Sequence, residues 1–407
     1  MLDHNRDQAV ICITGARVLL GDDVVETSVT VSNGRIVEIG SHSCDVEVDG
    51  RGLFLAPALV DIHGDAFERQ VMPRPKVFFP MDAALLDTDR QLAGNGIATA
   101  YHALTLSWEP GLREVSRGQA FIDGLAALDG RLTVENRVQL RWETFAFEAV
   151  DLIKKALEAP LRPSIAFNDH TSMSMRDYDV PVQTRAFEHS AEFKAADPKD
   201  PRFVRKTGNY ERAGVSPEAY AELLLDVWER RPDVPGVMAQ IAGLGRAKGV
   251  PMLSHDDTQV ETRDYYRTLG AGIAEFPMQV HVAQSARDHG DHIVFGAPNV
   301  VRGGSHIDSP SAADMVEAGL CDALASDYFY PAMLAAVARL HAEKRAPLHR
   351  LWSLVSCGPA RASGLLDRGE IVVGKRADLV LVDWPEAGTP AVRMTMSAGR
   401  IAYRALV

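Results

Sequence analysis

Eight short apolar runs, separated by segments of helix length, occupy most of the chain between residues 56 and 360. Strand-like runs that alternate with helical stretches favour parallel βαβ units, and eight such units are the number that closes a barrel. The sequence therefore predicts an α/β protein built on a (β/α)8 TIM barrel. The expected strands end at His63, Leu104, Glu143, His170, His255, Phe276, Pro298 and Asp327.

The two ends of the chain follow a different pattern. Residues 10–55 contain short β-rich runs, and Asn33-Gly34 between two of them is a strong two-residue hairpin signal. Short strands with turn residues return near the C-terminus. Because chain termini often lie close together, we expect residues 1–55 and 365–407 to form one small β-sandwich domain. Residues 56–364 would then form the catalytic barrel.

Composition limits the partners of this chain of 407 residues. Its net charge of -12 at pH 7 argues against a nucleic-acid partner, since phosphate backbones need a basic surface. The sequence shows no secretion signal and no apolar run long enough to span a membrane, so we expect no membrane partner. The four cysteines form no CxxC pair, which is typical of a reduced, cytoplasmic protein. A small-molecule substrate, anionic ones included, fits these limits, and a homo-oligomer stays open.

Several of the apolar runs end in side chains that can bind a metal ion. His63 and Asp65 lie at positions i and i+2, so they share one face of a strand and can reach one ion together. Imidazole and carboxylate ligands suit zinc, and they also allow manganese or iron. We therefore predict a centre of two divalent ions, with Zn2+ preferred and Mn2+ or Fe2+ as alternatives. The predicted metal ligands are His63, Asp65, Glu143, His170, His255 and Asp327.

These ligands divide into two sets in the predicted centre. His63, Asp65 and Asp327 would bind one ion, His170 and His255 the other, and Glu143 would lie between them. Such a pair generates hydroxide at neutral pH and stabilises the charge that develops in a hydrolysis. Asp327 would orient this hydroxide and take its proton, so the predicted catalytic residues are Asp327 and Glu143. A single strand-end His or Asp is often only a loop cap, but six of them at successive strand ends indicate a catalytic site.

The segment 299–306 follows the seventh run and contains Arg302. Its two glycines let backbone N–H groups approach an anion, and the arginine offers a forked set of charged donors. Phosphate sites of TIM barrels often form after this strand, so we predict a phosphate or phosphonate cradle; the alternative is a turn with an exposed arginine. The predicted substrate-binding residues are Arg302, Gly303, Gly304, His306, Asn299, Arg74, Lys76 and His102.

Some of these residues have an ordinary structural alternative. Arg74 and Lys76 would bind distal phosphates or lie in a solvated loop, and His102 would touch substrate or be a packed histidine. Asp256 and Asp257 would support the metal ligands: one would fix a histidine tautomer and the other would cap the next helix. Residues 171–215 are polar and interrupt the alternation, which is typical of a lid or substrate loop.

Several segments resemble the amidohydrolase superfamily: LAPALVDIHGD, QLRWE, SHDD, GAPNVVRGGSH and the closing LLDRGEIVVGKRADLVLVD. GAPNVVRGGSH and SHDD are similar to the diphosphatases of the carbon–phosphorus lyase pathway. The resemblance implies a distorted (β/α)8 barrel with metal ions at the carboxyl ends of its strands. It also implies hydrolysis of α-D-ribose 1-methylphosphonate 5-triphosphate, or a relative, at a phosphoanhydride bond with release of pyrophosphate.

The chain departs from these relatives at residues 171–175, where they usually have a proline-glycine-glutamine run. This loop motivates a second hypothesis, hydrolysis of a cyclic amide, N-acyl group or lactone by the same metal centre. A third hypothesis is an inert binding paralogue. Such paralogues usually lose a metal ligand, whereas all six candidates are present here. The superfamily also often draws ligands from strands four, five and six, whereas Glu143, His170 and His255 follow strands three, four and five.

Overall fold

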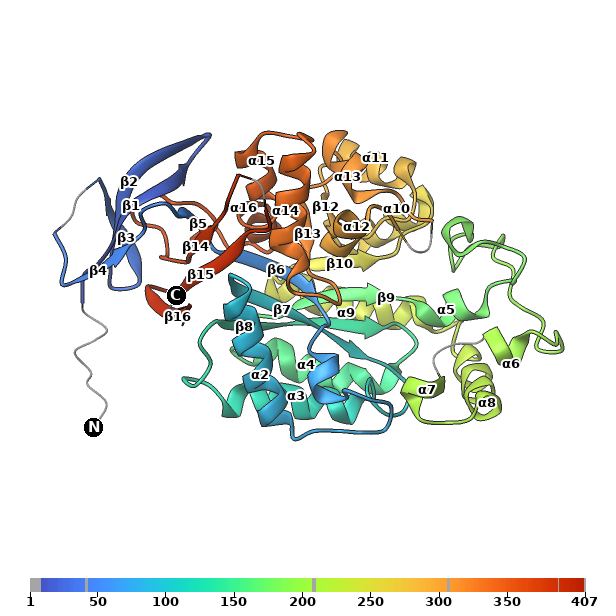
Figure 1. The fold of residues 1–407 in the computed structure, drawn as a ribbon. Helices are drawn as coiled ribbons and strands as arrows, with labels where there is room; N and C mark the ends of the chain where they lie inside the picture. The colour runs from blue at the N-terminus through green and yellow to red at the C-terminus, as the bar shows by residue number, and fades with distance from the viewer. Residues whose placement is uncertain (1–8, 41–42, 207–209, 306–307, 387, 406–407) are drawn as a thin grey trace.

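A computed structural model describes residues 9–40, 43–206, 210–305, 308–386 and 388–405. Its larger sheet is parallel, and its eight strands follow one another in chain order (Figure 1). An isolated parallel bridge between Gly64 and Asp327 joins the first strand to the segment after the last, so the barrel is nearly closed. The predicted barrel and its count of strands are confirmed. The strands are β6 (Leu59–Gly64), β7 (Ile97–Leu106), β8 (Glu135–Glu143), β9 (Ser164–Asn168), β10 (Met252–His255), β11 (Ile273–Glu275), β12 (His292–Gly296) and β13 (Ala323–Ala325).

Small and branched side chains fill the barrel interior. Val60 and Ile62 of β6 pack there with Leu253, Ile273 and Val294, and all five are buried. Alanines on β9 and β13 complete this layer. The interior is therefore a packed core of the kind found in TIM barrels, and it holds the strand ends in a fixed arrangement.

Helices surround the barrel (Figure 1). Residues 217–248 contain two helices, α8 (Pro217–Trp228) and α9 (Val234–Lys248). Pro232 lies between them, and a proline disfavours helical geometry at the preceding residue. The helices outside the segment 170–228 are α1 (Glu68–Val71), α2 (Met81–Gly94), α3 (Val115–Ala127), α4 (Val150–Glu158), α9 (Val234–Lys248), α10 (Val260–Leu269), α11 (Val280–Asp288), α12 (Ala297–Arg302), α13 (Ala312–Glu317), α14 (Ala332–Ala342), α15 (Leu348–Ser353) and α16 (Cys357–Ala362).

Both chain ends contribute to a second, mixed sheet beside the barrel (Figure 1). Antiparallel pairing of β14 with β5 joins the two ends. The predicted hairpin connects β2 to β3, with φ of 50° at Asn33 and 75° at Gly34, as a two-residue turn of this type requires. The strands are β1 (Ile11–Leu20), β2 (Asp23–Ser32), β3 (Arg35–Ile39), β4 (Val46–Asp49), β5 (Phe54–Pro57), β14 (Leu379–Asp383), β15 (Ala391–Ser397) and β16 (Arg400–Arg404).

The polar stretch after β9 forms a long excursion at the end of the molecule opposite the mixed sheet (Figure 1). Met175, Tyr178, Phe203 and Leu224 pack into a small buried cluster of their own, so this excursion has its own anchor. Among the described residues, no helix combines the length and the apolar character needed to cross a membrane. The excursion contains α5 (His170–Met175), α6 (Phe203–Lys206), α7 (Tyr210–Ala213) and α8 (Pro217–Trp228).

Candidate metal centre

Three barrel strands end in the same unusual backbone turn. Asp256, Phe276 and Asp327 have φ values of 61°, 55° and 55°, in the left-handed region that residues other than glycine seldom adopt. The N–H group of each still completes the barrel ladder, at 3.0 Å, 2.9 Å and 2.9 Å from the carbonyl oxygens of Glu275, Val294 and His63. Each such turn costs about 1–3 kcal/mol, and strain of this kind collects at functional sites. These turns therefore mark the carboxyl ends of the strands as the candidate site.

The first group of candidate ligands joins the start and the end of the barrel. His63, Asp65 and Asp327 each offer one ligating atom, and these atoms lie within 4.8 Å of one another. Burial and the charge of Asp65 raise the pKa of Asp327 to about 7. Two half-buried carboxylates that converge repel each other, and a bound cation would reverse this effect. The donor set therefore fits a divalent metal ion.

The second group lies beside the first. His170, His255 and Asp256 again bring one ligating atom each within 4.8 Å of the others. Burial, with the positive charge of Arg141, keeps the pKa of His170 well below its ordinary value. The imidazole of His170 is therefore neutral, which is the form that binds a metal ion.

Glu143 is not in either group, although we expected it to lie between the two ions. Its carboxylate accepts hydrogen bonds from the side chain of Asn168 at 2.9 Å and from the N–H groups of His170 and Thr171 at 3.0 Å and 3.1 Å. The hydroxyl of Thr171 donates a fourth at 2.7 Å. A carboxylate at a helix N-terminus satisfies free N–H groups. Glu143 therefore holds the start of α5, and the predicted bridging and catalytic role does not fit this geometry.

Glu275, at the end of β11, was missed by the sequence analysis. It is fully buried, and its carboxylate lies 3.0 Å from Nδ1 of His63 and 2.8 Å from Nδ1 of His255. The sequence did contain a signal for Glu275, because this glutamate lies near the end of the sixth apolar run. That run was interpreted only as a strand, and its glutamate was not considered as a site residue. Glu275, His63 and His255 also form a group whose ligating atoms lie within 4.8 Å.

Arg141 was missed as well. One of its nitrogens lies 2.8 Å from Nε2 of His255, and another lies 3.6 Å from a carboxylate oxygen of Asp65. Gln139, Arg141 and Glu143 alternate along β8, and alternate residues of a strand point to one face. This period-two pattern could have indicated that the side chain of Arg141 points to the same face as that of Glu143.

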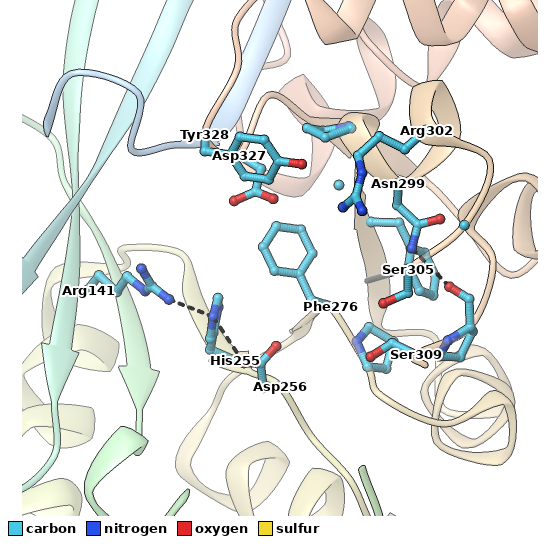
Figure 2. Close-up of a pocket in the computed structure, with 16 residues that line it drawn as sticks. Arg141, His255, Asp256, Phe276, Asn299, Arg302, Ser305, Ser309, Asp327 and Tyr328 are labelled. Carbon is cyan, nitrogen blue, oxygen red and sulfur yellow. Dashed lines mark hydrogen bonds and ion pairs between the residues drawn. The ribbon is translucent and has the colours of Figure 1, made fainter. Parts of the chain in front are cut away.

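A cavity of about 190 Å3 adjoins the candidate ligands. Figure 2 shows Arg141 and Arg302 on opposite sides of it, with Asp327 and Phe276 between them. The cavity is lined by Arg141, His255, Asp256, Phe276, Pro277, Phe295, Gly296, Pro298, Asn299, Arg302, Gly304, Ser305, Ser309, Pro310, Asp327 and Tyr328.

The predicted phosphate cradle lies partly in this cavity. Arg302 and Gly304 line it, whereas Gly303 ends α12 and packs toward Arg339. Asn299 also lines it, but its amide donates to the carbonyl of Pro310 at 3.1 Å and accepts from the N–H of Ala312 at 2.9 Å. Its amide therefore secures the loop. His306 lies outside the described residues.

Three further predicted substrate contacts do not reach the cavity. Arg74 and Lys76 are exposed in the loop after α1 and do not line it. His102 lies in the middle of β7 and not at its end, between Phe67 and Phe121. One imidazole nitrogen of His102 lies 2.7 Å from Oδ1 of Asn136. The predicted substrate contact of His102 is wrong because β7 continues to residue 106, which leaves this side chain on the outer face of the barrel.

The two aspartates after β10 have separate surroundings. Asp256 lies 3.5 Å from Nε2 of His255 and belongs to the second ligand group. Asp257 accepts a hydrogen bond from Ser254 at 2.5 Å and pairs with Arg263. It neither contacts a histidine nor caps α10, which begins after Gln259. The predicted supporting role of Asp257 is therefore wrong.

The buried position of His102 predicts a pH-dependent stability. Burial lowers the pKa of His102 to about 4, below its ordinary value of 6.5, so the unfolded chain takes up the proton first as the pH falls. The contribution of His102 to the free energy of unfolding is complete above pH 6.5 and is lost as the pH falls toward 4. Between these values, we expect the free energy of unfolding of the wild type to fall by about 3 kcal/mol more than that of His102→Gln. Urea denaturation of the metal-free proteins would measure this difference, and parallel losses would contradict it.

A parallel barrel whose strand ends present imidazoles and carboxylates is typical of metal-assisted barrel hydrolases. Residues 233–403 match the model of the amidohydrolase family. Alpha-D-ribose 1-methylphosphonate 5-triphosphate diphosphatase of Escherichia coli (strain K12) is 30% identical over 379 residues, which cover 91% of this chain and 94% of the relative. The chain belongs to the amidohydrolase family, and it is a hydrolase of that superfamily.

Solved structures of low sequence identity share the fold. Molinate hydrolase matches with a TM-score of 0.63 at 14% identity, over 97% of this chain and 94% of that one. A zinc-bound adenosine deaminase from Xanthomonas campestris matches with a TM-score of 0.62 at 15% identity, over 96% of this chain and 92% of that one. These similarities support the architecture alone.

Proposed function

We propose that this protein is a metal-dependent diphosphatase that cleaves a ribosyl 5-triphosphate, such as α-D-ribose 1-methylphosphonate 5-triphosphate, and releases pyrophosphate. The observation that carries the proposal is the cavity itself, which places Arg141 and Arg302 on either side of an aspartate and histidine cluster. Carboxylates and imidazoles suit metal ions, whereas the two guanidinium groups suit phosphates. The 30% identity to the Escherichia coli diphosphatase supports this choice of substrate.

Two groups of residues would hold the ions, for which zinc is the first candidate and manganese or iron the alternatives. His63, Asp65 and Asp327 form one group, and His170, His255 and Asp256 form the other. Asp256 thus joins the second group, whereas Glu143, which was predicted to lie between the ions, belongs to neither. Bound divalent ions would supply a strong nucleophile at neutral pH and stabilise the charge of the transition state.

The side chains of the cavity have separate roles in the reaction. The carboxylate of Asp327 accepts the proton of the attacking water, whose oxygen forms a bond to the α-phosphorus. The bond from this phosphorus to the bridging oxygen of the β-phosphate breaks, and pyrophosphate leaves with that oxygen. Arg302 neutralises the leaving pyrophosphate, and Arg141 pairs with the phosphate that stays on the sugar. The substrate is therefore a small phosphorylated sugar, and we place the reaction in the cytoplasm.

Phosphorus NMR of the zinc-loaded protein tests this function. The panel contains nucleoside triphosphates and ribosyl 5-triphosphates with and without a 1-phosphonate, and a chelator-treated sample is the control. We expect pyrophosphate and a sugar monophosphate to appear only with metal and fastest with the phosphonate. Unchanged phosphorus spectra with metal present would overturn the proposal and favour an amide or lactone substrate.

A further inference from the structure

We propose that Glu275 is a positioning residue that fixes the tautomers of two metal-binding histidines, one in each ligand group, and so couples the two ion sites. The inference rests on the metal centre of the proposed function. It concerns a single carboxylate that lies between Nδ1 of His63 and Nδ1 of His255, at 3.0 Å and 2.8 Å. Each of its oxygens contacts one ring: Oε1 lies nearest to Nδ1 of His63, and Oε2 lies nearest to Nδ1 of His255.

The surroundings leave the Glu275 carboxylate little freedom to move. Gln139 donates from Nε2 to Oε1 of Glu275 at 2.8 Å and to the carbonyl oxygen of Ile62 at 3.1 Å. This amide therefore ties β11 to β8 and β6 across the barrel. Gln139 and Glu275 are both fully buried, so no solvent competes for these hydrogen bonds.

The two imidazole rings are held as one unit with this carboxylate. The rings of His63 and His255 stack with centroids 5.4 Å apart and an interplanar angle of 18°. Phe276 packs edge-on against both rings, at 5.0 Å and 5.4 Å. Rotating either ring would therefore disturb the other ring and the phenyl group.

The chemical consequence follows from proton placement. A carboxylate accepts hydrogen bonds only, so each ring presents an Nδ1–H group to Glu275 and keeps Nε2 unprotonated for a metal ion. On His255 this Nε2 lies 2.8 Å from a nitrogen of Arg141, which can only donate to it, and 3.5 Å from Asp256 of the second ligand group. His63 belongs to the first group with Asp65 and Asp327. One buried carboxylate thus prepares one imidazole for each ion.

Two substitutions give a graded test, read as zinc content by elemental analysis and as zinc affinity by chelator competition. A glutamine can accept from only one Nδ1–H group and must donate to the other ring, which then carries its proton on Nε2. We expect wild type to hold two ions, Glu275→Gln to bind one of them 10- to 100-fold more weakly, and Glu275→Ala to bind both more weakly. Asp257→Asn is the matched control. Asp257 is a buried carboxylate that follows His255 by two residues and contacts neither ring, so this variant should keep both ions.

The alternative outcomes separate the two proposals. If both variants lose the same single ion, Glu275 is itself a ligand and the positioning role is wrong; unchanged affinities would also overturn it. A wild type that binds no metal would instead remove the metal centre of the proposed function. A wild type that binds two ions but releases no pyrophosphate would refute only the substrate.

A measurement on the wild type avoids dependence on variants that fail to fold. Long-range 1H–15N spectra of the zinc-loaded wild type report which ring nitrogen of each histidine carries the proton. We expect protonated Nδ1 and zinc-bound Nε2 on both rings. Zinc on Nδ1 of either ring would overturn the inference.

Discussion

Asp327→Asn should lower kcat/KM for pyrophosphate release by roughly 10²- to 10⁴-fold, the usual contribution of a positioned acid or base. The carboxamide cannot take the proton of the attacking water, and it is a poorer ligand for the group that Asp327 forms with His63 and Asp65. The fold should survive, because asparagine also tolerates the left-handed φ of 55° found here. Steady-state kinetics with zinc content measured on the same sample would show the loss.

Asp257→Asn is the matched control for this variant. Asp257 is a buried aspartate at the same end of the barrel, but it pairs with Ser254 and Arg263 and not with the candidate ligands. Its substitution should leave kcat/KM within a few-fold of the wild type. Retention of more than a tenth of wild-type activity by Asp327→Asn would refute the assigned role of Asp327.

Arg302→Met should lower kcat/KM for the triphosphate roughly 10- to 100-fold. A hydrogen bond to a charged group contributes about 1.5–3 kcal/mol, and methionine keeps the length of the side chain without its charge. Arg302 is exposed at the end of α12 and lines the cavity, so its loss should spare the fold. Kinetics on the triphosphate and on a substrate without the terminal phosphates would locate the effect.

Arg339→Met provides the comparison. This exposed arginine packs behind Gly303 and donates to Glu343 and to the carbonyl oxygen of Val301, but it does not line the cavity. Its kinetics should resemble those of the wild type. Equal effects of the two substitutions would show that the region matters only through its structure, and an unaffected Arg302→Met would favour an uncharged substrate.

Where local patterns decide the structure, the sequence was sufficient. Barrel strands are buried on both faces, so they appear as apolar runs, and all eight were recognised. Asn33-Gly34 forms the expected turn because its positive φ values need these residue types. His63 and Asp65 lie in one candidate metal group with Asp327, as their spacing of two along a strand suggested.

Residue type and position in the sequence could not show which strand-end carboxylate meets which partner. Glu143 and Glu275 both end barrel strands, yet one accepts the N–H groups of α5 and the other holds two imidazoles. The difference comes from elements that are distant in the sequence, namely the helix that follows β9 and the histidines of β6 and β10. Similarly, whether His102 faced the cavity or the core depended on where β7 ends.

The sequence by itself therefore determined the class of fold, the edge of the barrel that carries the chemistry and most of the candidate ligands. These features depend on hydrophobic period and on spacing along single strands, which are local properties. The tertiary structure alone decided the use of Glu143, the position of Glu275 between His63 and His255, and the approach of Arg141 to His255. These contacts join residues 20 to more than 200 positions apart, and only the pairing of neighbouring strands and packing across the barrel bring them within hydrogen-bonding distance.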